Sequence, residues 1–119
     1  MTPRKNFDHL PSGLAKALAV VGEWWTLLIV ISIHEGNHRF ENIQSSLDIA
    51  RNILTDRLTT LVDKKVVYKV EYSSKPRRFE YHLTECGLEL IPICNDLEMW
   101  GNKWFNDDDG SAGVPAKAK

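Results

Sequence analysis

The spacing of apolar side chains along the first third of the chain predicts two helices. Leu14 and Leu18 recur at helical spacing between Ser12, a candidate N-cap, and Gly22, where we expect a short helix to end. The next run, EWWTLLIVISIHEG (23–36), is apolar on nearly every side, which is typical of a helix buried in the centre of a domain. Its β-branched residues would also suit a strand, so both interpretations stay open.

Two amphipathic segments follow, with a tight turn between them. Ile43 and Leu47 indicate one or two helical turns in ENIQSSL (41–47), and the preceding HRF (38–40) is a candidate short strand. The segment 48–65 is the clearest helix, because its apolar residues fall together at helical spacing: Ile53, Leu54, Leu58, Leu61 and Val62. The step from Leu47 to Ala50 leaves room only for a tight turn, and two short helices joined by about three residues predict a helix-turn-helix.

After residue 65 the apolar period changes from about 3.6 to about 2, which indicates strands. Apolar and polar residues alternate along 66–72 and along 78–83, on either side of the polar segment 73–77. We expect a hairpin with 73–77 as its turn, one apolar face on the core and one polar face in water. The apolar face would consist of Val66, Tyr68, Val70, Tyr72, Phe79, Tyr81 and Leu83. On the polar face, Glu80 and Lys69 would pair across the strands.

A last helix and two irregular ends complete the pattern. Thr84 is a candidate N-cap, and an apolar stripe follows it at Leu88, Ile91, Cys94, Leu97, Trp100 and Trp104. Pro92 lies within this helix and should kink it or interrupt its hydrogen bonds. Residues 1–9 have the composition of a flexible arm and residues 106–119 that of a disordered tail, which leaves one domain over residues 10–105.

The distribution of charge adds a candidate function. The net charge of the 119 residues is −1, but residues 51–78 carry eight basic and three acidic side chains, a local charge of 8 − 3 = +5. Residues 79–119 carry three basic and eight acidic side chains, a local charge of 3 − 8 = −5. Because an electric field acts where its charges lie, the basic middle of the chain indicates a nucleic-acid partner.

Other functions find little support. Cys86 and Cys94 lack metal-site spacing, and unpaired thiols indicate a reducing compartment. The chain has no signal peptide pattern, and its longest apolar run, 24–33, is too short to cross a bilayer, so we expect a cytoplasmic protein without a membrane partner. Without a phosphate loop, nucleophile elbow or triad pattern, we expect neither an enzyme nor a cofactor. We expect no metal site, because the histidines are scattered over three elements: His9, His34, His38 and His82.

The order of elements describes a winged helix-turn-helix, an α+β and mostly helical fold with a two-stranded wing. Three segments also carry a family resemblance, namely VVGEWWTLLIV (20–30), RFENIQSSL (39–47) and residues 49–87. The most specific motifs are Leu54-Thr55-x-Arg57-Leu58 and Arg78-x-Glu80-Tyr81-x-Leu83-Thr84-x-x-Gly87. In these motifs the chain resembles the HxlR-type transcriptional regulators, relatives of the MarR group, over roughly residues 10–104.

The resemblance implies a homodimeric DNA-binding protein whose first and last helices form the dimer interface. The residues expected in that interface are Leu14, Leu18, Leu97, Trp100 and Trp104. The chain also departs from the family pattern. Leu10 stands where many relatives have a cysteine, which removes one type of thiol switch, and Glu23-Trp24 replaces the usual Gly-Lys. Lys65 replaces a glycine in a left-handed position, and Ala50 replaces a serine cap, which leaves Asp48 as the substitute cap.

The N-terminal end of the second helix of such a motif enters the major groove. Arg51 and Asn52 lie there and are the first candidates for base edges, because arginine suits guanine and asparagine suits adenine. Thr55 and Thr59 could reach phosphates or thymine methyl groups. Asp56 either accepts from a cytosine amine or orients Arg51 or Asn52, and the two alternatives stay open.

The hairpin tip is the second candidate DNA contact. In a winged helix it lies beside the duplex, where Lys75, Arg77 and Arg78 would neutralise phosphates or enter the minor groove. Ser73 and Ser74 can donate to phosphate oxygens. A charged turn is usually only a solvated turn, and the preceding helix-turn-helix is what favours the functional interpretation. Arg57, by contrast, should have a structural role, with its head paired to a carboxylate or a backbone carbonyl.

We therefore expect a sequence-specific transcriptional regulator that binds a pseudo-palindromic operator as a homodimer. The alternative is a winged-helix module that binds protein instead of DNA, which the acidic C-terminal third favours. The expected partners are double-stranded DNA, a second copy of the chain and an unidentified small-molecule effector. An aromatic-lined pocket between the first, second and last helices is the candidate effector site.

Overall fold

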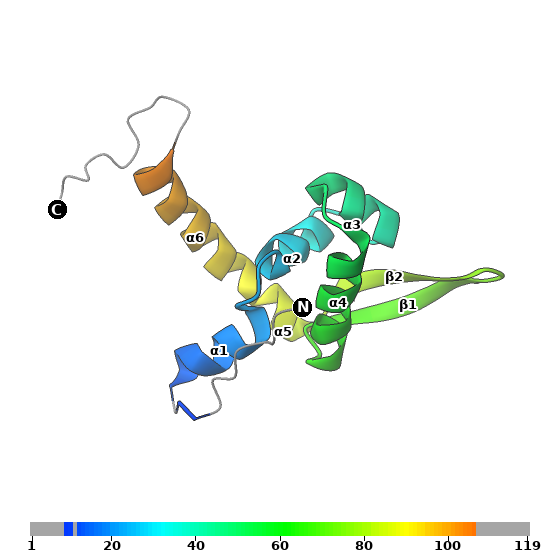
Figure 1. The fold of residues 1–119 in the computed structure, drawn as a ribbon, viewed down its shortest axis with the longest axis horizontal. Coiled ribbons are helices and arrows are strands. Elements are labelled where there is room, and N and C mark those ends of the chain that lie inside the picture. The colour runs from blue at the N-terminus through cyan, green and yellow to red at the C-terminus, as the bar shows by residue number, and fades with distance from the viewer. Residues whose placement is uncertain (1–8, 11, 107–119) are drawn as a thin grey trace.

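The computed structural model describes residues 9, 10 and 12–106. Almost all of the expected arm (1–9) and tail (106–119) therefore lies outside the described residues. The elements follow in the order α1 (Gly13–Val21), α2 (Thr26–His34), α3 (Phe40–Leu47), α4 (Arg51–Asp63), β1 (Val67–Ser74), β2 (Arg77–Leu83), α5 (Glu85–Leu88) and α6 (Leu90–Phe105) (Figure 1). The predicted class, an α+β and mostly helical winged helix-turn-helix, is confirmed.

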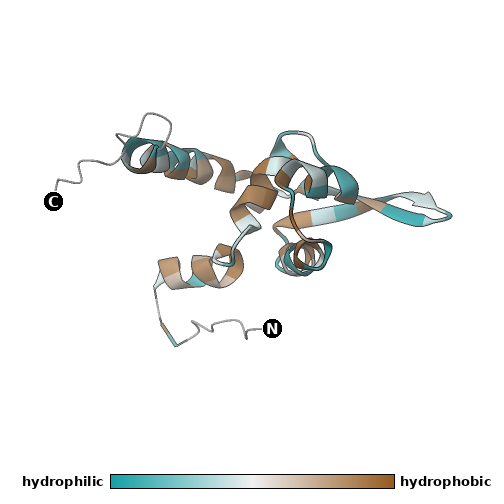
Figure 2. Cartoon of the chain, turned by 45° about the horizontal axis from the view of Figure 1, so that its top comes forward, coloured by the Kyte–Doolittle hydropathy of each residue, from teal (hydrophilic) through white to brown (hydrophobic). Residues whose placement is uncertain are grey.

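The core lies where α2, α3, α4 and the base of the hairpin meet. Its fully buried side chains are Ile29, Val30, Ile33, Ile43, Leu54, Leu61 and Val67. Figure 2 shows hydrophobic residues concentrated there and hydrophilic residues along the outer part of the hairpin. The helix-turn-helix is thus fixed to a rigid base, which is what a binding surface on α4 requires.

The second predicted helix exists, so the strand alternative for 23–36 is wrong, but it is not buried on every side. It begins at Thr26, after Trp25 in a left-handed conformation with φ 80°. Leu28 is 54% exposed, because no described element covers that side of α2. An apolar helix with an open face indicates a surface that still lacks its partner.

The turn between α3 and α4 differs from the expected capping. Asp48 has φ 55° and ends α3, so it is not the N-cap of α4. Ala50 precedes α4 and offers no side-chain cap. The side-chain amide of Gln44 donates to the Ile49 carbonyl at 3.3 Å, which ties the turn to α3. Lys65 has the expected left-handed conformation, with φ 64°.

The hairpin register corrects the predicted faces. Residues opposite each other in an antiparallel pair share a face, and Val67 lies opposite Leu83 while Tyr68 lies opposite His82. The apolar residues of β1 and those of β2 therefore lie largely on different faces. Tyr68 is 47% exposed, whereas Val67 is buried on the side of the core. The two faces were assigned wrongly because the register shifts by one residue between Glu71 and Ser73, and the alternation of each strand does not reveal such a shift.

Two further hairpin predictions also need correction. Residues Lys75 and Pro76 alone separate the strands, so the turn is shorter than 73–77. Glu80 does not pair with Lys69; its carboxylate lies 3.3 Å from the Arg39 guanidinium, and the backbones of Arg39 and Glu80 form an isolated bridge. Lys69 instead lies opposite Tyr81. The predicted short strand at 38–40 is thus reduced to the single bridge at Arg39.

The last predicted helix is divided in two. The Thr84 hydroxyl accepts a hydrogen bond from the Gly87 backbone N–H at 3.1 Å and caps α5, as predicted. The break falls at Glu89, so Pro92 lies in the first turn of α6, where a missing N–H costs little.

The described helices also bear on membrane crossing. Taken singly, none of those within residues 9, 10 and 12–106 is both long and apolar enough to span a bilayer. The pair α1 and α2 meets both conditions only jointly, and it is bent by 74°.

Candidate nucleic-acid interface

Both candidate base-reading residues lie at the exposed start of α4. The Arg51 guanidinium lies over the Phe40 ring, 4.7 Å from its centroid, so its planar group is held at the surface. Asn52 is exposed, and within the described part of the chain its side chain makes no hydrogen bond. Its amide is therefore available to an incoming base.

Thr55 and Thr59, the two candidate contact threonines of α4, have already used their hydroxyl protons. Thr55 Oγ1 donates to the Arg51 carbonyl at 3.0 Å, and Thr59 Oγ1 donates to the Thr55 carbonyl at 2.8 Å. A hydroxyl that donates within its own helix cannot donate to a phosphate without rotating. Of the two expected roles, this geometry favours apolar contact with thymine methyl groups.

Asp56 lies beside the next residue of the helix. Its Oδ2 lies 2.6 Å from Arg57 Nη1, and its two candidate roles at the DNA stay predictions. Arg57 also donates from Nε to the Trp24 carbonyl at 2.9 Å, which confirms the structural interpretation of this arginine. The pair neutralises an acidic side chain that would otherwise repel phosphate.

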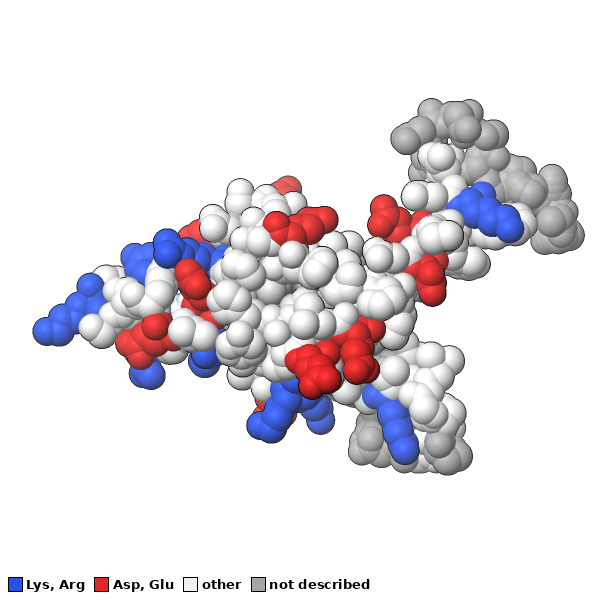
Figure 3. Space-filling view, turned by 180° about the vertical axis from the view of Figure 1, so that it is seen from behind, with Lys and Arg blue, Asp and Glu red and all other residues white. Residues whose placement is uncertain are grey.

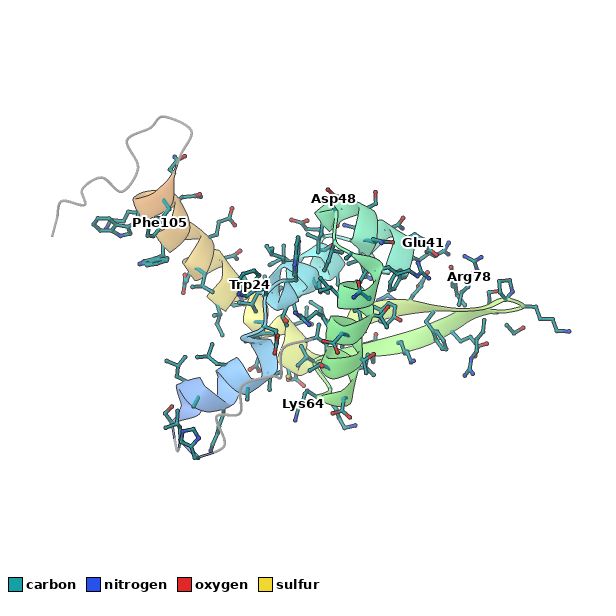
Figure 4. The ribbon with its side chains drawn as sticks, viewed as in Figure 1. Trp24, Glu41, Asp48, Lys64, Arg78 and Phe105 are labelled. Atoms are coloured by element: carbon teal, nitrogen blue, oxygen red, sulfur yellow. The ribbon has the colours of Figure 1, made fainter. Side chains whose placement is uncertain are left out.

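The basic wing is partly neutralised by acidic side chains that sequence patterning missed. Arg77 lies 3.6 Å from Glu71, and Arg78 lies 3.7 Å from Glu41 at the start of α3 (Figure 4). Lys75 has no ion pair among the described residues. Figure 3 shows basic and acidic side chains interleaved at the hairpin end of the molecule. The predicted basic tip therefore combines Lys75 with two exposed ion pairs, which are weak and exchangeable.

The serines of the hairpin differ in availability. Ser73 Oγ donates to the Pro76 carbonyl at 2.8 Å and thus stabilises the turn. Ser74 is exposed beside it. Ser74 is therefore better placed than Ser73 to donate to a phosphate oxygen.

The start of α3 brings the recognition helix and the wing together. Arg51 of α4 lies over Phe40, and Arg78 of the wing pairs with Glu41, the next residue along the chain. A cleft of about 520 Å³ also lies between α4 and the hairpin, lined among others by Thr55, Thr59, Lys69 and Phe79. The cleft thus joins α4 to the middle of the hairpin, whereas the tip residues 73–78 do not line it.

Side-chain contacts anchor the base of the wing to the loop before α3. His38 Nδ1 lies 2.8 Å from the Tyr81 carbonyl oxygen, and its ring stacks on that of His82 at 4.1 Å. The hydrogen bond with His82, together with the Arg39 guanidinium, lowers the pKa of Glu80 below its ordinary value. The wing is therefore held in a fixed orientation relative to the helix-turn-helix.

A second surface, on the opposite part of the fold, is apolar. Figure 1 shows α1 and α6 extending away from the central body. Leu14, Leu18, Leu97 and Trp100 are exposed, by 69%, 41%, 48% and 58%, and Trp104 is half-buried. Pattern reading missed further exposed apolar residues there: Leu28, Ile93, Met99 and Phe105. The sequence of α2 could have indicated this surface. A helix that is apolar on every side must be packed against other elements on every side.

The groove between α2 and α6 differs from the expected effector pocket. Its volume is about 540 Å³, and its walls are aliphatic rather than aromatic, with two acidic residues at the rim. The lining residues are Leu27, Leu28, Ile31, Glu35, Cys94, Leu97 and Glu98. Burial raises the pKa of the Cys94 thiol, which makes it a weak nucleophile.

Known proteins share both sequence and fold with this chain. A family model described as HxlR-like helix-turn-helix matches residues 20–109. The uncharacterized HTH-type transcriptional regulator Rv3095 of Mycobacterium tuberculosis H37Rv is 39% identical over 97 residues, and the match covers 82% of this chain but only 61% of that relative. YvaP of Bacillus subtilis 168, also an uncharacterized HTH-type transcriptional regulator, is 32% identical over 92 residues, which cover 76% of this chain and 85% of YvaP.

Solved structures agree with these matches. PA1607, solved as a candidate transcription factor, superposes with a TM-score of 0.79 and 34% identity over 90% of this chain and 75% of its own. A candidate MarR-family regulator from Porphyromonas gingivalis W83 superposes with a TM-score of 0.68 and 28% identity, over 77% of this chain and 91% of its own.

Proposed function

Because the chain belongs to the HxlR-like helix-turn-helix family of transcriptional regulators, we propose that it binds a pseudo-palindromic DNA operator as a homodimer. The relatives are regulators and not enzymes. Since the chain spans only 61% of the length of the mycobacterial relatives, the partners given below are proposals. Residues 10–105 would form the DNA-binding domain, and binding to the chromosome would place it in the cytoplasm.

The observation that carries this proposal is the shared surface of α4 and the wing. Arg51 and Asn52 are exposed at the end of α4 that enters the major groove in this motif. The wing contacts the start of α3 through Arg78 and Glu41, and Arg51 of α4 lies over Phe40 at the same place. One duplex can therefore meet base-reading groups and phosphate-binding groups together, as specific recognition requires.

Each residue has a distinct role in this proposal. Arg51 and Asn52 contact base edges, while the methyl groups of Thr55 and Thr59 contact thymine. Asp56 stays paired with Arg57 and so does not repel the duplex. In the wing, phosphates are bound by Ser74, Lys75, Arg77 and Arg78, and Ser73 holds the turn.

The exposed apolar residues of α1 and α6 support a second copy of the chain as the partner on the other surface. Exposed apolar patches of this kind mark interaction sites in stable proteins. A symmetric dimer would place two recognition helices in successive major grooves, about 34 Å apart. The two half-sites of the operator would then mirror each other. A small-molecule effector stays a prediction, with the groove between α2 and α6 as its candidate site.

We expect binding to a selected operator to weaken steeply with salt. The duplex would be obtained by selection from a random-sequence library, and its affinity measured by fluorescence anisotropy. A dimer that contacts at least six phosphates should lose about a thousandfold in affinity between about 50 and about 200 mM salt. The winged-helix protein-interaction module would instead bind no duplex at low salt, and that result would refute the proposal.

Replacing Asn52 by alanine should change sequence preference more than general affinity. The loss of one bidentate contact should cost roughly 1–3 kcal/mol at one base pair of each half-site. Affinity for an unrelated duplex should stay within about twofold, because this side chain contacts no phosphate. Binding to single-base operator variants measures the effect. A uniform loss on every duplex would contradict base recognition by Asn52.

A further inference from the structure

Arg57 differs from the other arginines whose ion pairs the structure shows. Its side chain is only 16% exposed, whereas those of Arg39, Arg77 and Arg78 are at least 50% exposed. It lies on the recognition helix α4, yet its guanidinium points away from the candidate DNA surface, toward the segment between α1 and α2. A nearly buried guanidinium on this helix therefore serves the interior of the fold and not the duplex.

Three groups surround this guanidinium. Nε donates to the Trp24 carbonyl at 2.9 Å, Nη2 lies 3.5 Å from Glu23 Oε1, and Nη1 lies 2.6 Å from Asp56 Oδ2. One of these acceptors belongs to α4 itself, and two belong to the junction between α1 and α2. A planar fork with donors in several directions can hold all three at once, which the single ammonium of lysine cannot do.

The junction is a place where the chain needs such support. Trp25 adopts φ 80° without being glycine, a conformation that costs about 1–3 kcal/mol and persists only when neighbouring contacts enforce it. At this point α1 and α2 are bent by 74°. Ala15 is the one buried residue of α1, so the packing of α1 itself restrains its direction weakly. The contact of Arg57 with the Trp24 carbonyl lies directly beside the strained residue in the chain.

We propose that Arg57 is a positioning residue that holds the α1–α2 junction against α4 and thereby sets the distance between the two recognition helices of a dimer. This inference rests on the proposed function, in which α1 contributes to the dimer and α4 binds DNA. A change in the angle of α1 moves the second recognition helix relative to the first. Arg57 thus determines which half-site spacing the dimer accepts, without touching DNA.

A spacing series tests this role. The selected operator would be compared with duplexes whose half-sites are moved by one or two base pairs, and with a duplex that has a single half-site. Each base pair shifts a half-site by about 3.4 Å along the helix and about 36° around it. The unsubstituted protein should lose about a hundredfold at a shift of two base pairs, because it then binds through one half-site only.

For Arg57→Lys we expect the loss of affinity at a shift of two base pairs to be less than about tenfold. Its affinity for the single half-site should stay within about threefold of that of the unsubstituted protein. Lys64→Arg is the matched control, since it exchanges the same two side chains at the C-terminal end of the same helix, and it should keep the full spacing preference. Sedimentation equilibrium and thermal unfolding show that each variant is dimeric and folded.

Glu23→Gln provides a second, milder variant. It keeps the bond from Arg57 to the Trp24 carbonyl and removes the ion pair between Glu23 and Arg57, so its spacing preference should lie between those of the unsubstituted protein and Arg57→Lys. If Arg57→Lys does not fold, Glu23→Gln alone tests whether the contacts of Arg57 set the accepted half-site spacing. An unchanged spacing profile in the folded variants would overturn the inference, as would an equal loss on all duplexes. Absence of DNA binding by the unsubstituted protein would instead refute the proposed function.

Discussion

Replacing Leu97 by glutamate and Trp100 by aspartate should convert the proposed dimer into a monomer and abolish tight operator binding. Both side chains are about half exposed on α6, so the fold of the single chain should tolerate the charges. In the proposed interface the same charges would be buried without partners, which strongly disfavours association. Joining two half-site contacts commonly raises affinity by about 10²–10⁴-fold, and we expect a loss of that order.

Sedimentation equilibrium and operator binding measure the two effects together. Asn95→Asp is a suitable control, because residue 95 lies about 200° around the helix from residue 97 and is exposed. Unchanged thermal unfolding of the monomer would show that the central body is intact. A double variant that still sediments as a dimer, or binds the operator as before, would exclude α6 from the interface.

Replacing Lys75, Arg77 and Arg78 together by alanine should weaken binding to every duplex by at least about a hundredfold. These side chains are exposed at the hairpin tip, and a dimer would lose six of them. Each lost phosphate contact lowers the salt dependence by about one unit in the logarithmic slope, so the slope should flatten as affinity falls. The loss should be the same for operator and unrelated sequence, unlike that of an Asn52 variant.

Affinity at several salt concentrations, on two unrelated duplexes, measures this result. The hairpin should remain folded, since its base is anchored by Arg39, Glu80 and the stacked rings of His38 and His82. Lys64→Ala, with one charge removed outside the wing, serves as the reference for a general charge effect. Affinity and slope equal to those of the unsubstituted protein would remove the wing from the interface.

Periodicity sufficed to predict most of the helices and the presence of a hairpin, but not the break between α5 and α6. The spacing of Leu54, Leu58 and Leu61 defined the inner face of α4, and all three are buried. The buried face of a helix can be predicted from its own sequence, because residues three and four positions apart lie on the same face. The candidate positions 51 and 52 followed from the same geometry.

Pairing between distant segments could not be predicted in this way. The faces of the hairpin depend on its register, which shifts by one residue at an irregularity between Glu71 and Ser73, after the two-residue turn at Lys75 and Pro76. The partners of the wing arginines, such as Glu41, come from another element and leave no local pattern. For Arg57 the kind of partner was predictable from its place beside the apolar stripe, but not the Trp24 carbonyl itself.

The carboxylates that pair with Arg77 and Arg78 have a consequence for how the protein searches a chromosome. When a phosphate binds, each arginine exchanges its carboxylate partner for the phosphate, so the phosphate does not meet an unpaired positive charge. Every duplex, operator or not, would therefore gain less from the hairpin tip than from unpaired cations, which would shorten each encounter during the search. Discrimination between sequences would then rest on α4.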